Sequence, residues 1–241
     1  TTGDSTVANK RSKRYREAAK LVDGERQYPL AEAIKIIKSM PPGKTNQTLS
    51  LAFKLSVDPR QSDQAVRGTV NLPHGSGKAV RVLVFAKGKA ADDAKAAGAD
   101  IVGFEDLVKK VSEGFQEFDV AVATPEAMQE VRKLGRVLGP RGLMPNPKTG
   151  TVTDDTAAAV KACKAGRVEF KVDKAANLHV PFGKAAFAEE QLLENGMAVA
   201  DAIFKAKPAS TKGTYIERAF VSATFSPGLR LEIGSLASKN N

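Results

Sequence analysis

The first 60 residues of the chain contain two different hydrophobic patterns. In PLAEAIKIIKSM (29–40) apolar residues recur every three or four positions, which predicts a helix that PPG at 41–43 ends. The next segment, TLSLAFKLSV (48–57), alternates strictly between apolar and polar residues and predicts a strand with one buried face. The other face carries hydroxyls and a lysine but no acid, so it is either a solvent-exposed surface or a platform for RNA.

The middle of the chain, from about residue 76 to residue 166, has a different organisation. AVRVLVFAKG (79–88) is nearly continuously apolar, the pattern of a strand that is covered on both faces. Helix and strand patterns then alternate through KAADDAKAAGA, ADIVG, FEDLVKKVSEG, FDVAVATP and PEAMQEVRKLGRVL. This order predicts a small doubly wound α/β domain with a parallel sheet.

Patterns of α+β type return after residue 166. AGRVEFKVD (165–173) alternates like a strand, and residues 187–208 predict a long helix. RAFVSATF (218–225) and GLRLEI (228–233) predict two strands that a Ser-Pro-Gly turn joins into a hairpin. We therefore predict one domain built from residues 1–75 and 167–241, with a second domain, residues 76–166, inserted into it. Two connections between the domains would form a hinge.

The charge of the chain indicates a polyanionic partner. Lys and Arg total 37 against 27 Asp and Glu, which gives a formal net charge of +10. Such an excess attracts nucleic acid above all. A basic run near the N-terminus is either a solvated first helix or an arm that contacts phosphates, each contact adding salt-dependent affinity. Its cations are Lys10, Arg11, Lys13, Arg14, Arg16 and Lys20.

The sequence lacks the motifs of the common enzyme and metal sites. HGSGK (74–78) precedes its strand and lacks the first glycine and the final Ser or Thr of a phosphate loop. No dinucleotide fingerprint follows residues 79–88. Cys163 is the single cysteine, on a predicted helix, and is expected to be a small buried residue. We predict no enzyme, no cofactor, no metal site and, without ~18 consecutive apolar residues, no membrane span. An α/β enzyme for a phosphorylated substrate remains a remote alternative to RNA binding.

One segment is unusual in composition. GRVLGPRGLMPNPKTGTV (135–152) has four glycines, three prolines and no acid, and it closely resembles the signature of the large-subunit ribosomal protein L-one family, bacterial type. Four further blocks resemble the family in the same order, and the resemblance covers roughly residues 10–233. These blocks are SVDPRQSDQAVRGTVNLPHGSGK (56–78), KAGRVEFKVDK (164–174), EEQLLEN (189–195) and KGTYIERAFVSATFSPG (212–228).

The resemblance implies a fold and a function. The fold is a split α+β RNA-binding domain, an RRM-like sandwich, with an inserted Rossmann-like three-layer α/β domain and a hinge near Gly75 and Gly166. The function is that of a structural constituent of the large ribosomal subunit, which binds the stalk rRNA beside the E site and helps deacylated tRNA to leave. Repression of translation through a leader in its own mRNA is a further expected role. We expect a free monomer in the bacterial cytoplasm, with an organelle ribosome as the alternative.

Carried over position by position, the resemblance places the rRNA contact in the split domain. The implied contact residues are Lys44, Thr48, Arg60, Ser62, Asp63, Arg67, Lys171, Asp173, Lys174, Thr224, Phe225, Ser226 and Gly228. Cations suit phosphates, and Ser and Thr hydroxyls suit 2′-hydroxyls and backbone oxygens. Further contacts with RNA or tRNA are expected at Arg11, Lys13, Arg14, Arg136, Arg141 and Lys148.

The chain departs from the family pattern at three places. Thr45 stands where the family usually has Phe, Ser50 where it has Glu, and Thr224-Phe225-Ser226 where it has Thr-Met-Gly. We expect the loss of a flat contact at Thr45, and apolar packing of Phe225 against the RNA in its place. Ser226 is more restricted in backbone conformation than glycine.

Overall fold

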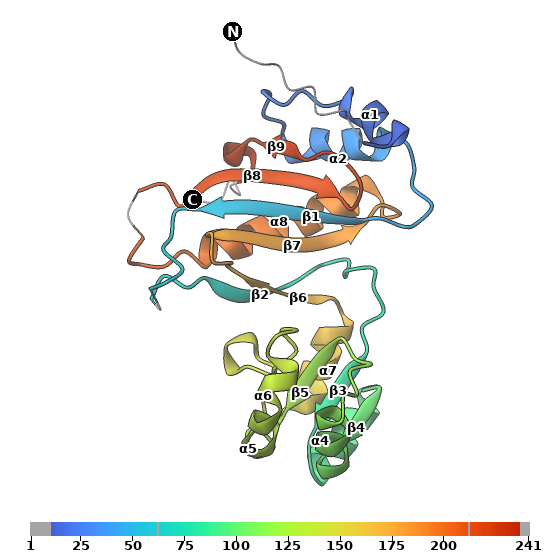
Figure 1. Cartoon of the computed structure of the whole chain (residues 1–241), viewed down its shortest axis with the longest axis vertical. Coiled ribbons are helices and arrows are strands. Elements are labelled where there is room, and N and C mark those ends of the chain that lie inside the picture. Colours follow the sequence, from blue (N-terminus) through green and yellow to red (C-terminus); the bar gives the residue numbers. More distant parts are fainter. Residues whose placement is uncertain (1–10, 62, 212, 237–241) are drawn as a thin grey trace.

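The largest sheet joins strands from both ends of the chain (Figure 1). The structure is a computed structural model that describes residues 11–61, 63–211 and 213–236, so the predicted contact Ser62 lies outside the described residues. The sheet is antiparallel in the order β7-β1-β8-β9. Its strands are β1 (Thr48–Leu55), β7 (Asn177–Lys184), β8 (Ile216–Ala223) and β9 (Leu229–Leu231). The predicted strand over 48–57 and the predicted C-terminal hairpin are both confirmed.

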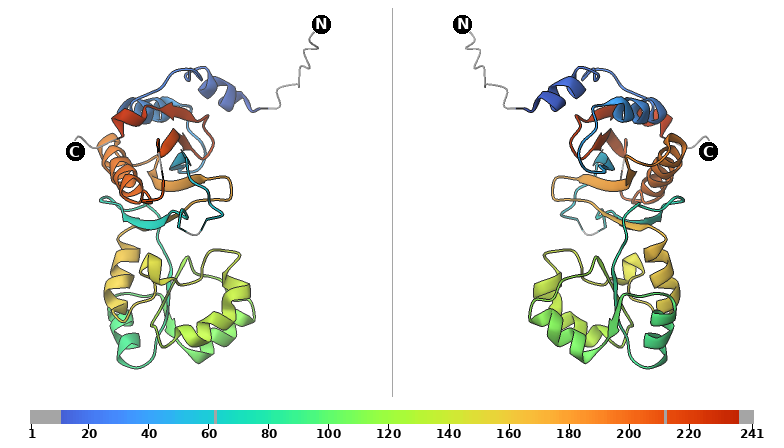
Figure 2. Two further views of the ribbon diagram at one scale, coloured as in Figure 1. Left: turned by 90° about the vertical axis from the view of Figure 1, so that its left-hand side faces the viewer. Right: turned by 90° about the vertical axis from the view of Figure 1, so that its right-hand side faces the viewer.

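Helices cover one face of this sheet and leave the other face open (Figure 2). On the covered face lie α2 (Leu30–Ser39) and α8 (Glu189–Lys205). The alternation in β1 decides which face is buried, because Leu49, Leu51 and Phe53 point into the helices and are at most 1% exposed. A short helix, α1 (Lys13–Ala19), precedes them and begins at Ser12, whose hydroxyl accepts a hydrogen bond from the Tyr15 N–H.

A second, parallel sheet is made by the middle of the chain in the order β4-β3-β5, with strands β3 (Val82–Phe85), β4 (Ile101–Gly103) and β5 (Val120–Ala123). The central strand β3 is buried throughout, as its continuous apolar pattern predicts. Helices α3 (Lys89–Ala96) and α7 (Thr156–Lys164) pack on one face, where Cys163 is buried. On the other face lie α4 (Glu105–Ser112), α5 (Met128–Val131) and α6 (Gly135–Leu138) (Figure 2).

The helix predicted over 125–138 is broken rather than continuous. A 3-10 turn, η1 (Arg132–Leu134), separates α5 from α6, and the second 3-10 turn η2 (Pro147–Thr149) lies in the glycine- and proline-rich segment. None of the described helices is long and apolar enough to cross a membrane. The structure as described is therefore mixed α/β with several sheets, as predicted, while the domain boundaries at 75/76 and 166/167 stay a prediction.

A two-stranded ribbon lies between the two larger sheets (Figure 1). It pairs β2 (Arg67–Asn71) with β6 (Arg167–Lys171) in antiparallel fashion. A Cβ at Gly68 would come within 2.7 Å of the Phe170 ring on the paired strand. The glycine therefore allows the Phe170 ring to pack closely on the opposite strand.

The two connections to residues 76–166 touch each other at a pair of glycines. Gly75 and Gly166 both have positive φ, +70° and +104°, and a Cβ on Gly166 would lie 2.4 Å from the Cα of Gly75. Asn195, fully buried on α8, fixes the same place from the side. Its Nδ2 donates to the carbonyls of Gly75 (3.0 Å) and Phe182 (2.8 Å), and its Oδ1 accepts from the His74 N–H (3.0 Å). The predicted hinge glycines are thus adjacent in space.

We expect Gly166→Ala to destabilise the protein more than a matched glycine replacement. Gly114 has a similar φ of +109° but no atom within 4 Å of a Cβ. Gly114→Ala should lower the free energy of unfolding by about 1–2 kcal/mol, the cost of the unfavourable backbone region alone. Gly166→Ala should lower it by about 2 kcal/mol more, because its Cβ also meets the backbone of Gly75. Urea unfolding followed by circular dichroism measures both, and equal losses would contradict the tight contact.

Candidate nucleic-acid interface

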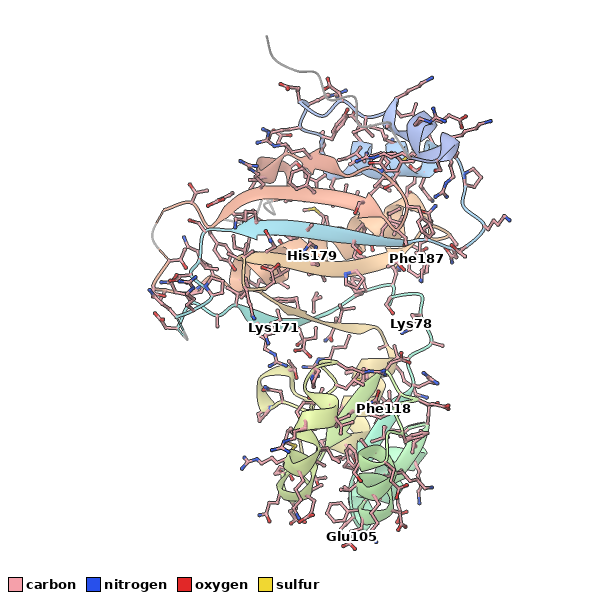
Figure 3. All side chains as sticks on the ribbon, in the orientation of Figure 1. Lys78, Glu105, Phe118, Lys171, His179 and Phe187 are labelled. Carbon is pink, nitrogen blue, oxygen red and sulfur yellow. The ribbon has the colours of Figure 1, made fainter. Side chains whose placement is uncertain are left out.

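The open face of the four-stranded sheet presents polar, basic and aromatic side chains in three cross-strand rows. Pro181, Ser50 and Ser222 form the first row, His179, Ala52 and Phe220 the second, and Asn177, Lys54 and Arg218 the third. None of these side chains is acidic; Glu217 lies at the irregularity near the start of β8. Figure 3 shows His179 on this sheet. A surface of this kind accepts phosphates, and the aromatic and proline rings suit stacked bases.

Sequence reasoning predicted the β1 part of this face and missed the parts from β7 and β8. His179 and Arg218 join the face only because β7 and β8 flank β1 in the sheet. The alternation of NLHVPF (177–182) is the signal that was available for β7, and Pro181 obscured it. Proline is tolerated there because β7 is the edge strand of the sheet.

The turn after β8 is bonded to the start of β1. Thr224 Oγ1 accepts from the Thr48 N–H (3.0 Å) and donates to the Thr48 carbonyl (3.3 Å), while Gln47 Oε1 accepts from the Phe225 N–H (3.0 Å). Ser226 Oγ accepts from the Ala223 N–H at 2.8 Å and so closes the turn itself. Four predicted contact residues, Thr48, Thr224, Phe225 and Ser226, therefore lie together, while Gly228 follows exposed and without a close neighbour at its Cβ position.

The basic N-terminal helix lies against this turn. Arg11, Ser12, Arg14 and Tyr15 together with the residues of the turn line a hollow of about 430 Å³. The Arg14 guanidinium carbon is 5.2 Å from the centroid of the Phe225 ring, and that of Arg11 is 4.5 Å from the Tyr15 ring. Phe225 is nevertheless 52% exposed, so one ring face is available to a base. The predicted arm and the predicted turn thus form one site, which their distance in the sequence did not indicate.

The predicted residues on and beside the β2–β6 ribbon differ in whether their charge is already paired with an acid. Arg67 and Lys171 are opposite each other in the ribbon, but the Arg67 Nε donates to Glu169 Oε1 at 2.7 Å. Lys171, labelled in Figure 3, is exposed and forms no ion pair with a described residue. The ribbon therefore offers Lys171 directly, whereas Arg67 is partly neutralised.

Two acidic residues near the ribbon hold turns in place. Asp173 accepts hydrogen bonds from the Asn177 N–H (2.7 Å) and the Ala175 N–H (2.8 Å), and the bond from Asn177 above all lowers the pKa of its carboxyl group. Asp58 accepts from the Arg60 N–H at 3.0 Å. These turns carry exposed predicted contacts, namely Arg60, Asp63 and Lys174.

The remaining predicted contacts lie elsewhere. Lys44 and Lys13 are exposed, the first in the segment before β1 and the second on α1. Arg136 is exposed on α6, Lys148 belongs to η2, and Arg141 borders a cavity between the β2–β6 ribbon and the parallel sheet. These three belong to the part of the structure around the parallel sheet rather than to the open sheet face. Among the described residues no three His, Cys, Asp or Glu side chains are grouped as a metal site would require.

A comparison with protein families finds a match over residues 36–227 to the model of the Ribosomal protein L1p/L10e family. The chain belongs to this family. The match begins within α2 and ends in the turn after β8, so it includes all of the parallel sheet and most of the open face. Proteins of this family are structural and non-enzymatic, and they bind the rRNA of the large ribosomal subunit. The predicted family, the absence of enzyme function and the binding of rRNA are confirmed.

We expect Phe225→Ala to weaken the binding of a large-subunit rRNA fragment about tenfold, because one stacked base loses its partner. The slope of affinity against salt should stay unchanged, since no charge is removed. Leu21→Ala is the matched control: Leu21 is the other large apolar side chain that is strongly exposed among the described residues, at 48%. Filter binding across a range of salt concentrations measures both variants. Equal affinities of the two variants would contradict a stacking role for Phe225.

Proposed function

We propose that this protein binds the stalk region of large-subunit rRNA, beside the E site, through one surface that we name the RNA face. The RNA face comprises Thr48 and the three rows of the open sheet, residues 224–228, the basic side of α1 with Arg11, and the exposed cations Arg60, Lys171 and Lys174 on the ribbon side. The meeting of the basic helix with the turn at Phe225 is the observation that carries the proposal. This arrangement brings cations, hydroxyls and exposed rings together on one side of the sheet, and none of the three rows contains an acidic side chain.

Each part of the RNA face has a distinct role in the proposal. Arg11, Arg14, Lys54 and Arg218 neutralise phosphates, which gives affinity that falls with salt. Thr48, Ser50 and Ser222 lie where hydroxyls can pair with 2′-hydroxyls and so distinguish RNA from DNA. The exposed ring of Phe225 receives an unstacked base of a loop or bulge. Lys171, Lys174 and Arg60 extend the contact along the ribbon side.

The decisive experiment is binding of the full chain to a stalk rRNA fragment across salt, beside a scrambled RNA of the same length. We expect tight binding to the stalk fragment, with a slope that corresponds to several phosphates, and much weaker binding to the scrambled RNA. Equal and weak binding to both would mean that the charge of +10 attracts any RNA and that the RNA face recognises no structure.

We also propose the finer fold that the resemblance implies. Residues 1–75 and 167–241 would form the RRM-like split domain, and residues 76–166 the Rossmann-like inserted domain. In support, one buried apolar cluster lies within residues 18–72 and 170–236, and two others lie within residues 82–163. The glycine pair at 75 and 166 would then be the hinge about which the inserted domain moves. Such motion would let the stalk release deacylated tRNA, with Arg136, Arg141 and Lys148 near the passing RNA.

A second function, repression of the protein's own synthesis, follows from the same surface. One RNA face cannot hold rRNA and an mRNA leader together, so the two RNAs should compete. An excess of stalk fragment should displace a labelled leader fragment completely, and simultaneous binding of both would exclude repression by this route. Bacterial cytoplasm is the setting in which we propose both functions, with the free protein a monomer.

Charge reversal tests the location of the rRNA contact. Arg60→Glu/Lys171→Glu should weaken binding to the stalk fragment about a hundredfold and reduce the salt slope by about two, because two phosphate contacts are lost. Lys109→Glu/Lys110→Glu makes the same change of charge on α4, outside the RNA face, and should change binding little. Equal losses in the two double variants would exclude the split domain as the principal contact.

A further inference from the structure

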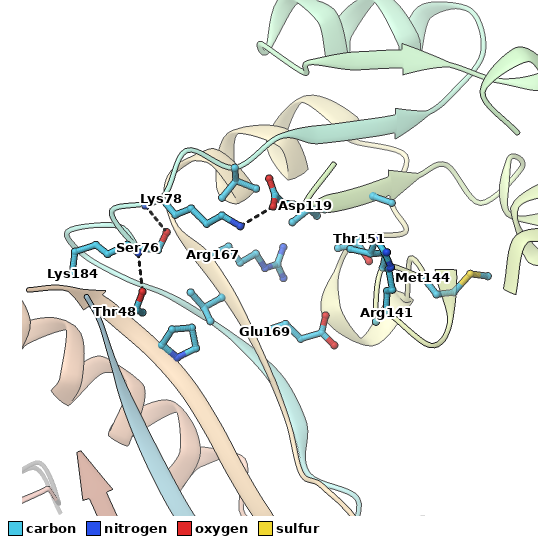
Figure 4. A pocket seen from close by; sticks show the side chains of 17 residues that line it. Thr48, Ser76, Lys78, Asp119, Arg141, Met144, Thr151, Arg167, Glu169 and Lys184 are labelled. Carbon is cyan, nitrogen blue, oxygen red and sulfur yellow. Dashed lines mark hydrogen bonds and ion pairs between the residues drawn. The ribbon is translucent and has the colours of Figure 1, made fainter. Parts of the chain in front are cut away.

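A cavity of about 500 Å³ lies between the β2–β6 ribbon and the parallel sheet (Figure 4). Its walls come from distant parts of the sequence: Arg141 to Met144 on one side, Arg167 to Glu169 on another, and Thr48, Pro181 and Lys184 on a third. The volume lies in the range of sites for small molecules such as nucleotides. Thr48 and Pro181 of the RNA face reach this cavity, but most of its lining, including Arg141, Leu143 and Arg167, lies outside that face.

The charges in the cavity do not balance. Its two acids are already paired: Asp119 with Lys78 at 2.7 Å and with Arg81, and Glu169 with Arg67. The hydrogen bond from Lys78 above all lowers the pKa of the Asp119 carboxyl group, so this acid is ionised at neutral pH and engaged. Three further cations, Arg141, Arg167 and Lys184, have no carboxylate partner among the described residues. The cavity therefore carries an uncompensated positive charge, which an anion would neutralise.

The side chain of Arg167 is the clearest indication of an anion site. Its Nη2 donates to Thr69 Oγ1 at 3.1 Å, but its Nε is buried and has no hydrogen-bond partner among the described residues. A buried donor without a partner costs free energy that a bound acceptor would recover. In Figure 4 the side chain of Arg167 extends between Lys78 on one side and Thr151 and Arg141 on the other. The guanidinium thus lies where it can meet an anion inside the cavity.

Apolar side chains form another part of the lining. Leu143 and Met144 lie on the wall that carries Arg141, and Val168 and Pro181 on the walls that carry Arg167 and Lys184. Apolar side chains beside cations match a ligand with a charged end and a flat uncharged end, which is the chemistry of a nucleotide. Lys184 Nζ is held by Thr48 Oγ1 at 2.7 Å, so its position is fixed before any ligand binds.

We propose that this cavity binds a free nucleoside di- or triphosphate. Its phosphates lie among Arg141, Arg167 and Lys184, and its base lies against the apolar wall of Leu143, Met144 and Val168. Because the lining comes from both sides of the glycine pair at 75 and 166, the bound nucleotide stabilises the arrangement in which the two sides are close. The cavity shares Thr48 and Pro181 with the RNA face, but the assay below contains no RNA, so its failure leaves the proposed function intact.

Calorimetric titration of the full chain with adenosine diphosphate, inorganic diphosphate and adenosine tests the proposal. We expect the nucleotide to bind most tightly, diphosphate about tenfold more weakly and adenosine weakest of the three. Equal affinity for nucleotide and diphosphate would rule out a nucleotide as the ligand. Equal affinity for nucleotide and adenosine would overturn the anion site.

Variants distinguish binding inside the cavity from non-specific attraction by the net positive charge of the chain. Arg141→Ala should weaken nucleotide binding about tenfold, since a charged hydrogen bond is lost while an exposed side chain is removed without damage to the core. Arg167→Lys keeps the charge but loses the planar donor fork, and should weaken it by a similar factor. The matched control is Arg132→Ala, an exposed arginine outside the cavity, which should bind like the unmodified protein. If Arg132→Ala and Arg141→Ala bind equally, the proposal is wrong.

Discussion

At Gly75 and Gly166 the two chain segments that lead to residues 76–166 pass closer than any residue with a side chain would allow. Both glycines have positive φ, so the crossing needs glycine for its backbone conformation as well as for space. The side chain of Asn195 fixes this crossing through hydrogen bonds with three backbone groups. Two of them, the His74 N–H and the Gly75 carbonyl, belong to the first connecting segment. Because Asn195 is fully buried on α8, the four-stranded sheet and its helices determine where the crossing lies.

The position of the proposed RNA face also depends on hydrogen bonds to the backbone, at the start of β1. Thr224 and Gln47 link the turn after β8 to the first residues of β1 by hydrogen bonds. The turn of the C-terminal hairpin therefore lies beside the start of this central strand. The hairpin turn in turn places Phe225 beside Arg14 of the basic helix. A flexible arm with six cations would contribute charge alone, whereas cations held against a fixed ring also present a defined stacking site. In the function that we propose, the ordered turn therefore makes the basic helix part of a specific RNA-binding surface.

Much of the fold could be predicted from periodicity, and the failures have physical causes. β1 was predictable because one residue in two contacts the helices, and β3 because both of its faces are covered. β7 and β2 were missed since Pro181 and Gly68 are poor strand formers, tolerated here by an edge position and by the ring of Phe170. The helix over 125–138 was predicted as continuous, but its apolar residues also fit the broken path through η1. Contacts such as Arg14 with Phe225 depend on tertiary packing, which no spacing in the sequence records.

The glycine- and proline-rich segment shows what unusual composition can and cannot predict. Its glycines and prolines and its lack of acids stand out in the sequence, and the structure adds a reason for one glycine: a Cβ at Gly150 would lie 2.8 Å from the Nη2 of Arg167. Gly150 thus leaves room for a guanidinium that comes from the opposite wall of the cavity. Arg141 and Met144, from the same segment as Gly150, lie on a different wall of the cavity from Arg167. The segment therefore shapes the space between the ribbon and the parallel sheet. Gly150 allows the close approach of Arg167, and Arg141 forms no ion pair with a described residue.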